Sequence, residues 1–366
     1  MNRTTINFIL SSTKLIMKRL LLFLPFLLGA LSISAQYDIV ELQYPVKAVK
    51  AGAVGPDGYY LLAYHKEKRT EDNVIRRYYT PELVHVNFNM EVQWRKRFPV
   101  AMFHSLTSIQ VDDNSIYLGG TDHNTGNEKS NGWVVCIDQS GNKKWEKRFS
   151  YPNYHTVEGR EVILTPDGDL LFTGHAYRNF NSYGSPVIYR LNKYGDVVWK
   201  SLYGTKYTLP HFNHGTFTQD GNLIFGGHVY PDNQSLRVSN TPRAWVAKIN
   251  LATGALMWDR YHKISSKSFL YAFSEAENGK LLGIGHANDD ILVTKLSAIG
   301  ELQDSETTGT CDKSHLRFIY KNPQTGISYA VGECIDERSN PKHLETVLAI
   351  FDQNLKEIDR LTIDAN

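Results

Sequence analysis

The chain lacks the short motifs by which many catalytic and metal sites are recognised. It has no His-Glu-x-x-His zinc motif, no Gly-x-Ser-x-Gly nucleophile elbow, no sialidase-type Asp box and no EF-hand loop. No stretch carries sustained helical periodicity, which excludes a mainly helical fold. Cysteine is scarce, with 3 residues in 366 and no adjacent pair. The sequence therefore predicts an all-β protein whose function is not indicated by any of these motifs.

A concentrated basic surface is missing as well. The formal net charge is +2, but residues 1–35 hold four of the 40 Lys and Arg residues and no acid, which leaves 36 basic and 38 acidic residues in the remainder. The basic runs at residues 95–97 and 143–144 fall on expected outermost strands, where solvated charges discourage edge-to-edge aggregation. Because nucleic acid requires a basic face, we expect no nucleic-acid partner.

The N-terminal segment has the layout of a secretory signal peptide. A basic pair at residues 18–19 precedes an apolar stretch at 20–31, and a run of small residues ends at Ala35. We predict cleavage after Ala35 and a secreted or periplasmic product. The residue directly after that point is not a Cys that could carry a lipid. A retained membrane anchor is the alternative, against which the short apolar stretch argues. Met17 directly precedes the basic pair and could be the first residue of the protein. Residues 1–16 are then either an upstream extension or the result of a mis-assigned start.

The rest of the chain, residues 36–366, repeats one unit six times. Each copy has a turn followed by a β-rich run that ends in small residues; the turns lie at Pro56–Gly58, Asp113–Asn114, Pro166–Gly168, Asp220–Gly221, Asn278–Gly279 and Thr325–Gly326. A second apolar run, a polar turn and a last run complete the copy. Such units cannot bury their own faces and must pack on one another. We predict one domain, a six-bladed β-propeller of four-stranded antiparallel blades (strands a to d). A seven-bladed ring is the alternative, but the residues for a seventh blade are missing.

Two further features indicate how the blades pack. Tryptophan recurs in strand d at Trp94, Trp145, Trp199 and Trp258. A Trp repeated so regularly is typical of an inter-blade packing anchor rather than of a ligand platform. The spare β run at residues 37–44 is expected to close the ring by joining the last blade.

The turn before one of these tryptophans carries a family resemblance. Residues 251–258, Leu-Ala-Thr-Gly-Ala-Leu-Met-Trp, resemble the quinoprotein-type (PQQ-like) repeat, and residues 138–145 and 192–199 are looser versions. The resemblance implies a β-propeller. Enzymes of that family hold their quinone with an adjacent Cys pair and a calcium cluster, which this chain lacks. The resemblance therefore implies a non-enzymatic secreted or periplasmic relative.

Histidine is concentrated on one expected face of the propeller, the face of the d-to-a and b-to-c connections. Ten of the 13 His fall there: His65, His123, His175, His228 and His286 after strand b, and His104, His155, His211, His214 and His315 near the start of strand a. Hairpin geometry predicts that His214 lies opposite Gly227. The cluster is interpreted either as a Zn or Cu site or acid–base group, or as an inter-blade contact copied into each blade.

The cysteines predict a structural bond on the same face. The sequence midpoint between Cys311 and Cys334 falls at the turn at residues 322–323. We therefore expect the two cysteines to be cross-strand neighbours and, in an oxidising compartment, to form a disulfide. A metal pair formed with His315 is the alternative. Cys136 lies in an apolar run and is expected to be a buried free thiol.

Two functions from different classes follow. The first is a protein- or glycan-binding module without a cofactor, in which Tyr177 and Tyr230 join His175, His228 and His286 as ligand contacts. Variable b-to-c loops would supply specificity; they are residues 66–77, 123–131, 177–185, 231–242 and 336–343. The second is a metal-assisted hydrolase or lyase using Zn or Cu, with His104, His155, His214 and His315 as ligands or bases. Partner, substrate and oligomeric state stay open.

Overall fold

The computed structural model describes most of the chain after the N-terminal segment. The described residues are 49–71, 74–98, 105–124, 129–179, 184–204, 211–230, 241–309, 312–322, 324–336 and 343–364. They form two compact units, one of residues 1–129 and 133–146 and one of residues 130–132 and 147–366, as far as these are described. Within the described ranges, no helix is long and apolar enough to cross a membrane.

Twenty-four strands account for the regular structure of the described chain. Blade 1 has β1 (Val49–Val54), β2 (Gly58–Glu71), β3 (Val74–Asn87) and β4 (Val92–Arg97), and blade 2 has β5 (Ser105–Val111), β6 (Ile116–Asn124), β7 (Lys129–Ile137) and β8 (Lys143–Phe149). Blade 3 has β9 (Thr156–Leu164), β10 (Leu170–Tyr177), β11 (Ser185–Leu191) and β12 (Val197–Leu202), and blade 4 has β13 (His211–Phe217), β14 (Leu223–Val229), β15 (Arg243–Ile249) and β16 (Leu256–His262). Blade 5 has β17 (Ser268–Glu275), β18 (Leu281–Ala287), β19 (Asp290–Leu296) and β20 (Leu302–Thr308), and blade 6 has β21 (Lys313–Lys321), β22 (Ser328–Asp336), β23 (His343–Phe351) and β24 (Glu357–Asp364).

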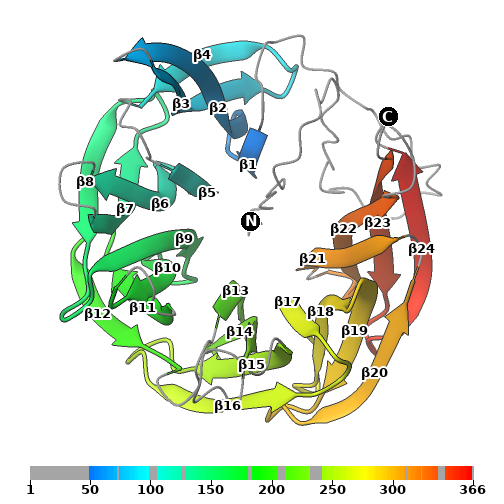
Figure 1. Cartoon of the computed structure of the whole chain (residues 1–366). Coiled ribbons are helices and arrows are strands. Elements are labelled where there is room, and N and C mark those ends of the chain that lie inside the picture. Colours follow the sequence, from blue (N-terminus) through cyan, green and yellow to red (C-terminus); the bar gives the residue numbers. More distant parts are fainter. Residues whose placement is uncertain are drawn as a thin grey trace. The chain divides into compact units, whose positions relative to one another are not determined.

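The fold class is the predicted six-bladed β-propeller, all-β in its described part. Each blade is a four-stranded sheet whose order follows the sequence. Burial follows the expected pattern: in blade 3, β10 is buried along nearly its whole length, whereas β12 is exposed or half-buried throughout. Figure 1 shows β9, β13, β17 and β21 on the inner edges of blades 3 to 6. The predicted closing strand at residues 37–44 and the signal peptide lie outside the described residues.

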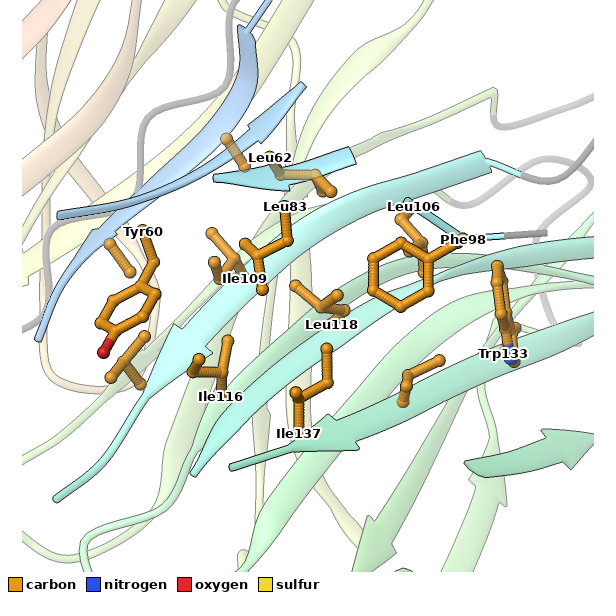
Figure 2. Packing of buried hydrophobic residues seen from close by; sticks show 14 residues of the cluster. Tyr60, Leu62, Leu83, Phe98, Leu106, Ile109, Ile116, Leu118, Trp133 and Ile137 are labelled. Atoms are coloured by element: carbon orange, nitrogen blue, oxygen red, sulfur yellow. The ribbon is translucent and has the colours of Figure 1, made fainter. Parts of the chain in front are cut away.

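The core between blades 1 and 2 shows why one blade cannot stand alone. Leu62 and Leu83 of blade 1 are fully buried against Ile109 and Leu118 of blade 2, and Figure 2 shows these side chains meeting between the two sheets. Full burial of such a side chain contributes about 1.5–3 kcal/mol. The neighbouring sheet contributes to that burial, so the sequence repeat and the fold have the same physical cause.

The recurring tryptophans are inter-blade anchors, as predicted. Trp94 Nε1 donates to the carbonyl of Gln139 at 3.0 Å, and Trp199 Nε1 donates to the carbonyl of Leu251 at 3.0 Å. In both cases the acceptor lies in the c-to-d turn of the following blade. The turn beside Trp199 needs a glycine, because Gly254 has φ of 71° and an added Cβ would lie 2.5 Å from the indole.

One predicted loop is a pair of strands instead. Residues 66–77 were expected to form a b-to-c loop, but β2 and β3 continue as a paired hairpin out to Glu71 and Val74. Alternating Lys, Glu, Arg and Thr fit a two-stranded ribbon as well as a loop, so polarity alone misled the prediction. Of the other predicted loops, residues 125–128, 180–183, 231–240 and 337–342 lie outside the described part of the chain.

Strand a carries an irregularity in every blade, at the same place relative to strand b. The pairing register shifts at Lys50, Thr107, Arg160, Asn213–His214, Tyr271 and Arg317. A bulge leaves its extra residue out of the ladder and redirects the side chain. Because strand a is the innermost strand in blades 3 to 6 (Figure 1), these bulges determine what those blades present toward their inner edge.

Candidate functional site

Seven rings from four consecutive blades form a continuous row, here called the ring arc. Its members are His175, His211, His228, Phe269, Tyr271, His286 and His315. The centroid distances between neighbours run 4.7 Å from His175 to His211, 4.7 Å on to His228 and 4.6 Å on to Phe269. They continue at 4.3 Å to His286 and 6.1 Å to His315. All seven belong to the second compact unit.

Strand register explains why the row is continuous. In blade 4, His211 of β13 is the cross-strand partner of His228 of β14, and the two imidazoles stack at 11°. In blade 5, Phe269 of β17 is the partner of His286 of β18, stacked at 16°. Strand a of one blade then reaches strand b of the preceding blade, as His211 does with His175. Within-blade stacking and between-blade contact therefore alternate.

Four imidazoles of the arc, those of His175, His211, His228 and His286, are held neutral. Burial, and then the charge of neighbouring His and Arg groups, lowers the pKa of His228 to about 3 and that of His286 to about 4. Burial and Arg160 lower the pKa of His211 to about 4. The pKa of His175, which is buried, lies well below its usual value for the same reasons. At neutral pH each of these rings therefore has one N–H donor and one bare nitrogen acceptor.

Several ring nitrogens of the arc have no hydrogen-bond partner. Both nitrogens of His175 and the Nδ1 atoms of His228 and His286 are buried and unpaired. Native proteins pair nearly all buried polar atoms, so each exception requires an explanation. Repetition of the same exception in three blades is what a surface built to hydrogen-bond a ligand would produce.

The blade 6 end of the arc carries charge. Arg317 Nε donates to His315 Nε2 at 2.5 Å, and its guanidinium lies 5.5 Å from the centre of the Tyr271 ring. His315 Nε2 is also 3.5 Å from the Glu333 carboxylate. Arg317 is the bulged residue of β21, and Arg160 is the bulged residue of β9. A guanidinium suits planar anionic groups such as carboxylates.

A buried carboxylate and an imidazole form a second feature beside the arc. His214 Nδ1 lies 2.6 Å from Glu161 Oε1, and the Glu161 side chain is only 5% exposed. Burial alone would lower the pKa of His214, but the charge and hydrogen bond of Glu161 raise it above its usual value. The other oxygen, Glu161 Oε2, is buried without a hydrogen-bond partner.

Two register predictions made from the hairpins are wrong. Phe212, not His214, lies opposite Gly227, and His211 lies opposite His228, because β13 is already one residue out of the predicted register at the turn and the Asn213–His214 bulge adds one more. Ser314 lies opposite Cys334, where Cys311 was expected, because Lys321 pairs with Ser328 and the turn is therefore centred between residues 324 and 325 rather than at 322–323. Cys311 is outside the described residues, so the disulfide stays a prediction.

The remaining predicted residues divide between the arc and its surroundings. His175, His228, His286 and His315 are in the arc, and Tyr230 lies edge-on to His228 at 5.6 Å. His155 precedes β9, with its Nδ1 atom 3.2 Å from the Thr156 hydroxyl. Tyr177 ends β10, where its carbonyl accepts the His155 N–H at 2.7 Å. His104 lies outside the described residues. Cys136 is the predicted buried free thiol.

Sequence reasoning did not assign a role to Glu161, Arg160, Arg317, Phe269 or Tyr271. All five are in strand a, and all but Phe269 lie at or beside its bulge. Nothing in a single sequence marks which residue will bulge. In the described part of the chain, no group of three or more His, Cys, Asp or Glu residues is arranged to hold a metal ion.

The fold is shared with solved structures of low sequence identity. A protein from Lactobacillus plantarum is 13% identical with a TM-score of 0.56, and 90% of each chain is covered. An ulvan lyase of a polysaccharide lyase family is 8% identical with a TM-score of 0.50, covering 86% of this chain and 78% of the lyase. These likenesses concern the fold alone. No protein-family model and no curated protein matches the chain.

Proposed function

We propose that the protein is a secreted or periplasmic glycan-binding β-propeller whose binding surface is the ring arc. The observation that carries the proposal is the set of unpaired nitrogens on His175, His228 and His286. A neutral imidazole offers one donor and one acceptor, which is the pairing that a sugar hydroxyl seeks.

The charge beside the arc favours an anionic glycan. Arg317 stands at the blade 6 end, and the charge of Arg160 acts on His175, His211 and His228. Carboxylate or sulfate groups on the polymer would pair with these guanidinium groups. The predicted signal peptide is consistent with a protein that meets such polymers outside the cytoplasm. Kinship with non-enzymatic PQQ-like propellers remains part of this proposal.

The test is direct binding to soluble polysaccharides. The purified protein is titrated calorimetrically with a neutral polysaccharide, a carboxylated one and a sulfated one, with ulvan included in the panel. We expect binding to an anionic member and at least a tenfold loss in the His228→Ala variant, equivalent to about 1.4 kcal/mol. Tyr194→Ala is the matched control, because Tyr194 is 62% exposed but belongs to the c-to-d turn of blade 3.

Two results would count against the proposal. One is no binding to any polysaccharide by a folded protein. The other is equal loss of affinity in His228→Ala and Tyr194→Ala, which would place the binding surface elsewhere. Capture of a protein partner that survives His228→Ala would instead favour the protein-binding interpretation of the b-to-c loops.

A further inference from the structure

The pair formed by Glu161 and His214 is an exception to the repeat. The first residue after the strand a bulge is uncharged in the other blades: Ala51 in blade 1, Ser108 in blade 2 and Ala272 in blade 5, all three buried, and Phe318 in blade 6. Blade 3 has a glutamate at this position, also buried. A carboxylate there must be desolvated, which costs several kcal/mol unless it is well paired. Packing alone gives no reason to replace a small residue with it.

The bulge of β13 points its two residues in different directions. Asn213 Nδ2 donates to the Leu270 carbonyl of blade 5 at 2.8 Å. His214 lies against Glu161 of blade 3, and its ring is 6.4 Å from the Phe318 ring of blade 6. Strands from three blades therefore fix the imidazole. With Nδ1 bound to the carboxylate, the other nitrogen, Nε2, is the one left to accept or donate a proton.

We propose that His214 is the general base of a metal-independent lyase that cleaves carboxylated polysaccharides bound at the ring arc, with Glu161 as its positioning residue. This inference rests on the proposed function. The reaction is a β-elimination. His214 Nε2 takes the proton from the carbon next to a sugar carboxylate. The C–H electron pair forms a carbon–carbon double bond, and the neighbouring carbon–oxygen bond breaks. The leaving oxygen takes a proton from the imidazolium or from water.

The neighbours of the pair supply what this reaction needs. Removal of such a proton is difficult until the carboxylate charge is neutralised, and positioned cations perform that task. Arg160 directly precedes Glu161 in the chain, and Arg317 directly precedes Phe318. Both are the extra residues of strand a bulges, and His214 lies at the corresponding bulge of β13. A base and two cations on the inner strands of blades 3, 4 and 6 thus accompany the arc.

Elimination fits the pair better than hydrolysis does. Glycoside hydrolysis usually needs two carboxyl groups that face the scissile bond. Glu161 is buried and its Oε1 is already bound to His214, so the imidazole is the group that the pair presents. An imidazole with a pKa raised by Glu161 is a stronger base than an isolated one. Two further members of the ring arc lie on neighbouring strands: Tyr271 on β17 and His228 on β14.

The experiment separates catalysis from binding. The full-length protein is incubated with the anionic polysaccharides that it binds, and the conjugated double bond of the product is followed by ultraviolet absorbance. We expect turnover to fall at least 100-fold in His214→Ala with polysaccharide affinity unchanged within about threefold, and added imidazole to restore part of the activity. Tyr194→Ala should leave both properties unchanged. His228→Ala should lose binding, so failure of the binding proposal is distinguishable.

A second variant tests the role of Glu161. Glu161→Gln removes the charge that raises the pKa of His214, so the ascending limb of kcat/KM against pH should move toward lower pH while circular dichroism stays native. A merely structural glutamate would not shift this limb. Binding without any double-bond product, reducing ends without a double bond, or full activity in His214→Ala would each overturn the proposal. The double variant Glu161→Gln/His214→Gln, which leaves no unpaired charge, replaces His214→Ala if that variant does not fold.

Discussion

Acidification should destabilise the fold well before its carboxylates are protonated. His211, His228 and His286 have pKa values of about 4, 3 and 4 when folded, below the value of about 6.5 expected in the unfolded chain. The unfolded state therefore binds more protons as the pH falls below about 6.5, and stability falls with it. The pKa of His214 is raised, so its pair with Glu161 acts in the opposite direction. That stabilisation is present below about pH 6.5 and is lost as the pH rises through the raised value.

The size of the effect follows from these shifts. An imidazole whose pKa drops from about 6.5 to about 4 makes the fold about 2 kcal/mol less stable at about pH 5 than at neutral pH. The rings are partly exposed and share their repulsions, so we expect about 1 kcal/mol from each. The three rings together lose about 3 kcal/mol; buried His175 adds to this loss, and the His214 pair opposes it. A net loss of about 3 kcal/mol is large beside a typical domain stability of about 5–15 kcal/mol.

Urea unfolding at about pH 7 and about pH 5 measures this loss, and two variants assign it. His228→Gln removes one titrating ring, so its pH dependence should be shallower by about 1 kcal/mol over that interval. Phe269→Leu removes the ring that lies between His228 and His286 but no titrating group. It should cost about 1 kcal/mol equally at both pH values. Equal stability of the parent protein at the two pH values, or an unchanged pH dependence in His228→Gln, would refute the reasoning.

Two further predictions concern stability. Gly300→Ala should destabilise by about 2–4 kcal/mol in urea unfolding, because Gly300 has φ of 80° and a Cβ would lie 2.4 Å from the Trp258 ring. Gly168→Ala, at φ of 89° with open space around it, should cost only the backbone strain of about 1 kcal/mol, and equal costs would rule out the indole contact as the cause. Cys311→Ser should lower stability by about 3 kcal/mol if the predicted disulfide with Cys334 forms. Three free thiols in the denatured, unreduced protein would show that it does not.

The blade architecture could be predicted because packing between blades imposes the same sequence pattern on every copy. Turns such as Pro166–Gly168, buried b strands such as β10 and the Trp of strand d each recur, so an error in one copy is corrected by the others. The extended hairpin of β2 and β3 has no such support. It occurs in one blade, and its polar residues fit a loop equally well.

The candidate site could be predicted only in part. The Gly-His pairs at His175, His228 and His286 repeat and are visible in the sequence, so the face was found. Their partners on strand a follow from register, which changes by one residue at each bulge and is also wrong wherever the turn is misplaced. That is why His214 was placed opposite Gly227 and why Glu161 was not considered. Hairpin arithmetic assumes an uninterrupted ladder, and the bulges fall between the turn and the site.

The departures from the repeat locate the chemistry better than the repeat itself does. Residues that recur from blade to blade, such as the Trp of strand d in blades 1 to 4, can be explained by packing between blades. The Gly-His rings lie in three consecutive blades of the second unit, whereas blade 2 has Thr121 at the matching position and blade 6 has Glu333. Glu161 is the one carboxylate at its position among the described blades, and its partner His214 lies at the bulge of β13. A desolvated carboxylate is costly, so selection for the function of its ion pair with His214 is the simplest reason for its presence.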